Sequence, residues 1–122
     1  MKYMLLGYTN AQTWDDQVVS AEEVQRICDF YEQFEQELRA SGEWVGSEGL
    51  ADPSHTTTVQ QVDGVPVATD GPYAELKESL VSFSIIDVAS HDRAVEIAAR
   101  VVGVTGEPIE IRPIMDGPPG DG

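Results

Sequence analysis

The sequence is short of the residue types on which most recognisable catalytic motifs depend. Its 122 residues include one cysteine, Cys28, and two histidines, His55 and His91. A single cysteine excludes a disulfide within the chain, and the histidines do not form a His-x-x-x-His metal pair. The chain also lacks a glycine-rich phosphate loop and a cysteine-histidine pair at a nucleophile spacing. We therefore expect neither a metal site nor a bound cofactor.

Basic side chains are also scarce, seven against 22 acidic ones, which gives a formal net charge of −15. The seven cations are scattered along the chain rather than clustered: Lys2, Arg26, Arg39, Lys77, Arg93, Arg100 and Arg112. Phosphate groups would be repelled by such a chain. The charge excludes nucleic acid and anionic lipid as natural partners, and an excess of acids by itself indicates solubility.

Long hydrophobic runs are absent, so the sequence contains no membrane-spanning segment. Met1 and Lys2 lead directly into a strand-like pattern rather than a signal peptide, which predicts a cytoplasmic protein. The length suits one domain, which we place at residues 1–115. Residues 116–122 have no apolar anchor, and we expect a disordered tail there.

Two helices are predicted from their caps and apolar spacing. Ser20 and Glu23 form a capping box before a helix that ends near Gly42. Ser90 caps a second helix, expected to end before Gly103. The apolar stripe of the first helix consists of Val24, Ile27, Cys28, Tyr31, Phe34 and Leu38. Because Cys28 lies in this stripe, we predict that its thiol is buried and inert.

Six strands complete the pattern: residues 3–8, 44–50, 56–62, 65–69, 81–88 and 107–115. Asp63-Gly64 predicts a hairpin between the third and fourth, and Pro66 places the fourth at a sheet edge. The order β-α-β, hairpin, β-α-β predicts an α+β, ferredoxin-like fold, with a mixed sheet and both helices on one face. Pairs such as Leu5-Leu6 and Ile85-Ile86 make the strands apolar on both faces, which favours a homodimer with the two sheets face to face.

The densest group of polar residues is the segment Thr69 to Glu78, TDGPYAELKE. Asp-Gly-Pro is typical of a tight turn, because glycine tolerates positive φ and proline fixes its own φ. Two interpretations remain open. Either Asp70 caps this turn while Glu75 and Lys77 are solvated, or these side chains point into a cleft.

The same segment carries a family resemblance. KYMLLGY at Lys2 to Tyr8, GSEGL at Gly46 to Leu50, TDGPYAELKE and EIRPIMD at Glu110 to Asp116 resemble, in order and spacing, the DGPF subgroup of the YCII-related domain family. Tyr73 stands where that subgroup usually has phenylalanine, and Leu76 where it has threonine. The resemblance implies a ferredoxin-like domain that pairs as a dimeric α/β barrel. The wider family is associated with a histidine in the first helix, but this chain has none between Ser20 and Ser41.

A carboxylate-rich site remains as the candidate for chemistry. We expect Asp70 and Glu75 to be catalytic, with Tyr8, Glu48, Tyr73, Lys77 and Arg112 binding the ligand. A desolvated carboxylate could take a proton from carbon next to a carbonyl, while Arg112 or Lys77 holds the enolate oxygen. The alternative for Arg112 is an ion pair with Asp70 or Glu48 that joins strands.

Two classes of function follow. The first is an enzyme acting on a small polar organic molecule that offers an anion to Arg112 or Lys77; related dimeric barrels host isomerase and dehalogenase reactions. The second is a non-enzymatic ligand-binding or regulatory module. It follows from the resemblance, because genes of the DGPF subgroup often lie beside those of extracytoplasmic-function sigma factors.

Overall fold

The computed structural model describes residues 1–10, 20–71 and 78–117. The elements in chain order are β1 (Lys2–Asn10), α2 (Ala21–Ser41), β2 (Trp44–Gly49), the 3-10 helix η1 (Pro53–His55), β3 (Thr57–Val62), β4 (Val65–Asp70), β5 (Glu78–Asp87), α3 (His91–Thr105) and β6 (Ile109–Pro113). The predicted element order is confirmed. Residues 73, 75 and 77, which belong to the predicted site, lie outside the described residues, as do residues 118–122 of the predicted tail.

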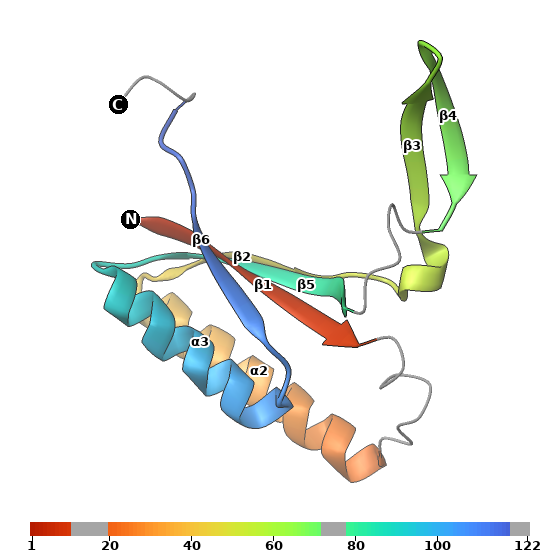
Figure 1. The fold of residues 1–122 in the computed structure, drawn as a ribbon. Helices are drawn as coiled ribbons and strands as arrows, with labels where there is room; N and C mark the ends of the chain where they lie inside the picture. Colours follow the sequence, from red (N-terminus) through yellow and green to blue (C-terminus); the bar gives the residue numbers. More distant parts are fainter. Residues whose placement is uncertain (11–19, 72–77, 118–122) are drawn as a thin grey trace.

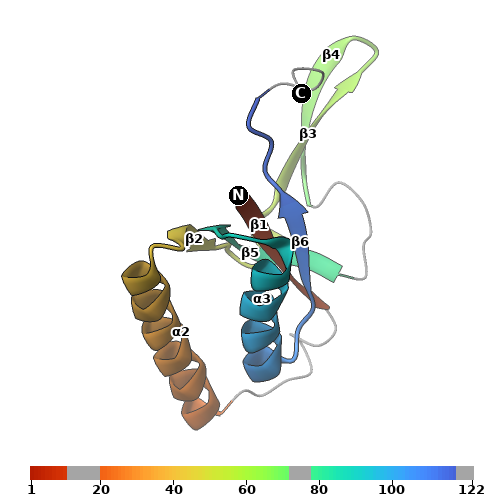
Figure 2. The same cartoon turned by 90° about the vertical axis from the view of Figure 1, so that its left-hand side faces the viewer.

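Four strands form one sheet in the order β2-β5-β1-β6, and β3 pairs with β4 in a separate two-stranded sheet. All pairs are antiparallel, so the prediction of a mixed sheet was wrong. Both helices cover the same face of the larger sheet (Figure 1). Figure 2 shows this two-layer arrangement from the side. The arrangement is compatible with a ferredoxin-like fold.

The strand register distributes apolar residues to both faces of the sheet. Leu5 lies opposite Ser84 on the helix side, and Leu6 lies opposite Phe83 on the other face. Between the helices and the sheet lies a hydrophobic core of ten buried residues from both layers: Tyr3, Leu5, Phe34, Leu38, Ile86, Val88, Ala94, Ile97, Ala98 and Val101. The opposite face is covered by no described helix, and we call it the open face.

The helix termini follow the local sequence closely. Ser20 Oγ accepts a hydrogen bond from the Glu23 amide, and Ser90 Oγ accepts one from the Arg93 amide, each at 3.2 Å. Gly42 ends α2 with φ 79°, in the left-handed region. The second helix continues past Gly103 to Thr105, so the predicted end was wrong; Gly106, with φ 72°, is its cap.

The prediction that Cys28 is buried was also wrong, because its thiol is exposed. Of the apolar stripe of α2, only Phe34 and Leu38 are buried. Both lie in the C-terminal half of the helix, near the sheet, whereas its first turns lie farther from the sheet (Figure 2). Periodicity identified the inward side of α2 but not the distance between that side and the sheet.

The β3-β4 hairpin projects away from the rest of the chain, on the side of the open face (Figures 1 and 2). Asp63 and Gly64 form its turn with φ of 51° and 82°, as Asp-Gly predicts. Four valines on the hairpin, Val59, Val62, Val65 and Val67, are exposed. These side chains give the hairpin an exposed apolar surface, and a two-stranded hairpin is only marginally stable by itself.

Neither α2 nor α3 is both long and apolar enough to cross a membrane; the finding covers the described residues only.

Candidate functional site

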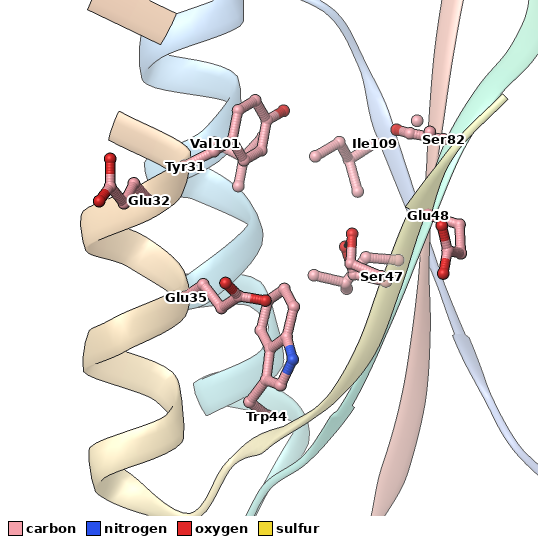
Figure 3. A pocket seen from close by; sticks show the side chains of 13 residues that line it. Tyr31, Glu32, Glu35, Trp44, Ser47, Glu48, Ser82, Val101 and Ile109 are labelled. Atoms are coloured by element: carbon pink, nitrogen blue, oxygen red, sulfur yellow. Dashed lines mark hydrogen bonds between the residues drawn. The ribbon is translucent and has the colours of Figure 1, made fainter. Parts of the chain in front are cut away.

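A cleft of about 450 Å³ lies between α2 and the helix side of the sheet (Figure 3). Its lining comes from both layers: Leu5, Gly7, Tyr31, Glu32, Glu35, Trp44, Ser47, Glu48, Gly49, Ser82, Ser84, Val101 and Ile109. A volume of this order is within the range of small-molecule sites, roughly 300 to 1,000 Å³.

Small residues on neighbouring strands leave this space unfilled. Gly7 lies opposite Ser82 on β1 and β5, and Ser47 lies opposite Ser84 on β2 and β5. All four positions are on the helix side, where large side chains would normally fill the space beneath a helix. Because these four residues offer so little bulk, side chains of the sheet do not fill the space beneath α2 and the cleft remains open.

Hydroxyl groups form the sheet wall of the cleft. Ser84 Oγ donates to Ser47 Oγ at 3.1 Å, and Ser82 is half-buried on the same strand. Hydroxyls both donate and accept hydrogen bonds, and their hydrogens rotate to suit a partner. This wall therefore suits a ligand with either kind of polar group.

The helix wall contributes one inward carboxylate, and Trp44, the first residue of β2, contributes an aromatic ring beside it. In Figure 3, Glu35 projects from α2 toward the ring of Trp44, while Glu32 points away from the cavity. Glu35 Oε1 accepts from Arg39 Nη2 at 3.3 Å, and the Arg39 guanidinium lies 5.8 Å from the centroid of the Trp44 ring. Glu35 and Trp44 thus already face a cation from their own chain.

Tyr31 brings a phenol to the cleft, and its pKa is raised. Burial is the larger cause and the nearby Glu107 carboxylate is the second, since both disfavour the phenolate. Glu107 itself accepts a hydrogen bond from the buried Thr9 hydroxyl at 3.0 Å. Tyr31 is therefore a hydrogen-bond donor at neutral pH rather than a base.

The structure does not gather the predicted site residues into this cleft. Tyr8, Glu48 and Arg112 lie on the open face, where Glu48 pairs with Phe83 and Arg112 with Met4. Glu48 contributes to the cleft lining, but its side chain points to the far side of the sheet (Figure 3).

Glu48 and Arg112 belong to the two edge strands, three strand spacings apart, which amounts to about 14 Å. An ion pair between them within one chain is therefore excluded. Arg112 forms no ion pair with any described residue, so the expected alternative that it joins strands through Asp70 or Glu48 was wrong.

Asp70 lies at the end of β4, exposed on the projecting hairpin. The amide of the next residue, Gly71, donates to the Thr56 carbonyl at 2.8 Å and not to Asp70. Tyr73, Glu75 and Lys77 lie outside the described residues. Their predicted roles, and that of Asp70 as a catalytic carboxylate, stay predictions.

Sequence reasoning missed the residues that do line the cleft. Tyr31 was assigned to the apolar stripe of α2, and Ser82 and Ser84 lie in the strand predicted at residues 81–88 without a predicted site role. The available signal was that Ser82 and Ser84 share their face with the buried Ile86. Within the described ranges, no three histidine, cysteine, aspartate or glutamate side chains are placed to hold a metal ion.

Comparison with known proteins gives a consistent result across nearly the whole chain. The family model described as the YCII-related domain matches residues 1–117. An uncharacterised protein of Rhizobium meliloti (strain 1021) is 30% identical over 127 residues, covering 99% of this chain and 98% of that protein. Since this relative is itself uncharacterised, it contributes no activity to the comparison.

Proposed function

This chain belongs to the YCII-related domain family, and on that premise we propose that it is a ligand-binding protein that takes a small organic molecule into the cleft between α2 and the sheet. The observation that carries the proposal is the composition of the cleft. It combines serine hydroxyls, a phenol donor and one inward carboxylate with the apolar side chains of Leu5, Val101 and Ile109. A mostly apolar cavity with a few placed polar groups is the usual form of a small-molecule site.

Binding is favoured over catalysis by the state of the polar groups. General-base chemistry needs a carboxylate or imidazole poised to accept a proton. The inward Glu35 already accepts a hydrogen bond from Arg39, and Tyr31 is held in its protonated form. A carboxylate base formed by Asp70 and Glu75 stays a prediction. So do membership of the DGPF subgroup, which the four sequence segments support, and a regulatory role beside a sigma factor, which rests on that resemblance.

A cavity-filling variant tests the proposal. Ser84→Leu places an apolar side chain in the cleft, and Ala99→Leu adds similar bulk at an exposed position of α3. A fragment library is screened by ligand-observed NMR against the wild type and both variants, after circular dichroism has confirmed that each is folded. We expect a set of fragments that bind the wild type and Ala99→Leu but not Ser84→Leu. Fragments that bind all three equally, or no binding fragment at all, would reject the cleft as a ligand site.

We further propose that two copies associate through their open faces. Met4, Leu6, Phe83 and Ile85 present apolar, partly exposed side chains there, and the exposed valines of the hairpin project on the same side. Leu6 lies opposite Phe83 and Met4 opposite Ile85, so these four side chains form one continuous apolar area on the open face. Two such areas packed face to face would exclude water from both.

Sedimentation tests this dimer. We expect one species near twice the chain mass of 13.3 kDa at micromolar concentration. Phe83→Glu, which places a carboxylate among the apolar side chains of the open face, should weaken the dimer, whereas Ala99→Glu at an exposed position of α3 should not. A clean monomer at micromolar concentration, or a dimer that Phe83→Glu leaves unchanged, would refute association through the open faces.

A further inference from the structure

We infer that the ligand of the cleft carries a positive charge, as an organic ammonium or amidinium group on an apolar body, and that this group binds against Glu35 and Trp44. The inference deepens the proposed function and rests on it, because it concerns the same cleft. It depends on three features of the walls: the sign of their charge, their aromatic rings and an internal cation already in place.

The charges on the lining have one sign. Three of the thirteen lining residues are glutamates, and none is lysine, arginine or histidine. Of the three, Glu35 is directed into the cavity (Figure 3). Glu107 adds a further carboxylate close enough to Tyr31 to raise the pKa of its phenol. An anionic ligand would meet repulsion from these carboxylates, in a chain of net charge −15, and Arg39, the cation beside them, is already paired with Glu35.

An aromatic ring beside a carboxylate is a recurrent way to hold an organic cation. The face of an indole ring attracts a cation within about 6 Å of its centroid, and the attraction grows as the group is desolvated. Trp44 is half-buried at the cleft, and Glu35 lies beside it (Figure 3). Tyr31 supplies a second ring to the lining, from α2.

Arg39 shows that Trp44 and Glu35 accept a cation. Its guanidinium lies 5.8 Å from the Trp44 centroid and 3.3 Å from Glu35 Oε1. This pair is weak, since the Arg39 side chain is 63% exposed and Glu35 41%. A ligand cation inside the cleft would have the same partners with less water around it, and would compete with Arg39 for Glu35.

The remaining lining suits the rest of such a molecule. Serine oxygens at positions 47, 82 and 84 accept hydrogen bonds from an ammonium group or bind a polar substituent. Leu5, Val101 and Ile109 provide the apolar surface for its body.

Three matched probes test the inference: 2-phenylethylammonium, 2-phenylethanol and 3-phenylpropionate, which share an apolar body and differ in charge. The readout is Trp44 fluorescence in a Trp14→Phe background, because the chain has only two tryptophans. At low salt we expect the ammonium to bind at least about tenfold more tightly than the carboxylate, with the alcohol between them. Added salt should reduce this difference.

Three variants tie the effect to Glu35. Glu35→Gln should weaken binding of the ammonium about threefold to tenfold and leave the alcohol unchanged. Arg39→Gln removes the internal competitor and should strengthen ammonium binding. The control, Glu22→Gln, makes the same charge change on α2 at about 20 Å along the helix axis, and it should behave as the parent.

The inference is overturned if the carboxylate or the alcohol binds as tightly as the ammonium; the cleft would then remain a ligand site without charge selection. It is equally overturned if Glu22→Gln weakens the ammonium as much as Glu35→Gln. No response of Trp44 to any probe also overturns it. In that case the fragment comparison with Ser84→Leu decides separately whether the cleft binds ligands.

Discussion

Arg93 and Glu43 are joined by two hydrogen bonds: Arg93 Nε donates to one carboxylate oxygen of Glu43 and Nη2 to the other, each at 2.8 Å. Glu43 precedes β2, and Arg93 lies in the first turn of α3. The Glu43 backbone also accepts from the Asp87 amide and donates to the Leu38 carbonyl. One residue thus connects the end of α2, the end of β5 and the start of α3.

The Arg93–Glu43 pair should make stability depend on acidic pH. The hydrogen bonds from Arg93 are the main cause that lowers the pKa of Glu43 in the folded state, against a smaller opposing effect of burial. A lowered folded pKa gives stability that is present above the unfolded pKa, near 4.5, and is lost as the pH falls through the folded pKa. Glu43→Gln should therefore cost about 1 to 2 kcal/mol at neutral pH and less in acid.

Urea unfolding at fixed protein concentration from neutral pH down to about pH 3 measures this difference. Glu35→Gln, which breaks only the exposed pair with Arg39, is the control and should cost less than about 0.5 kcal/mol. A Glu43→Gln deficit that stays constant across the whole pH range would contradict the coupling.

Tyr31 should ionise at a higher pH than an ordinary tyrosine. Burial and then Glu107 raise its pKa above 10.0, so its contribution to stability is present below the unfolded pKa and is lost as the pH rises through the folded pKa. Ultraviolet difference titration should show a late phenolate step that is missing in Tyr31→Phe. In Glu107→Gln the pH of this step should fall only part of the way toward that of an ordinary tyrosine, because burial, the larger cause, remains. Persistence of the late step in Tyr31→Phe would assign it to another residue.

Two glycines near the end of α3 should respond in opposite directions to alanine. Gly103 lies within the helix, and an added Cβ would meet nothing within 4 Å, so Gly103→Ala should stabilise by about 0.5 to 1 kcal/mol. Gly106 has φ 72°, so Gly106→Ala should destabilise by about 1 kcal/mol. Thermal unfolding of both variants checks this, and equal effects would show that the helix does not end at Thr105.

Gly7 and Ser82 should be energetically coupled at the base of the cleft. A Cβ at position 7 would lie 2.5 Å from Ser82 Oγ, so the hydroxyl must move in Gly7→Ala. We expect a cost of about 1 kcal/mol that is largely recovered in Gly7→Ala with Ser82→Ala. Gly49→Ala, which has open space at its Cβ, is the control. Independent, additive effects in the double-mutant cycle would count against this contact.

The features predicted correctly from the sequence depend on groups close together in the chain. The caps at Ser20 and Ser90 each use an amide three residues away, and the Asp63-Gly64 turn depends on the backbone freedom of two residues. Such preferences are set within the segment itself and do not depend on which distant segment packs against it. Gly103 was the local exception, because a helix tolerates an interior glycine at a cost of about 1 kcal/mol when its other residues continue the packing.

The residues that line the cleft could not be predicted from the sequence, because they meet only in the folded chain. Alternation in β1 and β6 correctly implies that Tyr8 and Arg112 share a face. It does not show that Arg112 and Glu48 lie on opposite edges of the sheet, which depends on the strand order. The Cys28 error has the same origin, because a helical stripe does not reveal how far a helix stands from its sheet.

The sequence alone determined the element order, the helix caps, the hairpin turn and the sign of the charge. Each of these follows from composition or from hydrogen bonds and backbone preferences within a few residues. Tertiary structure alone decided that Gly7, Ser47, Ser82 and Ser84 lie together beneath α2 and leave a cleft. It also decided that Glu35 and Trp44 meet there. The physical reason is that a cavity arises where bulk is missing from several strands in register, and register is a relation between distant segments.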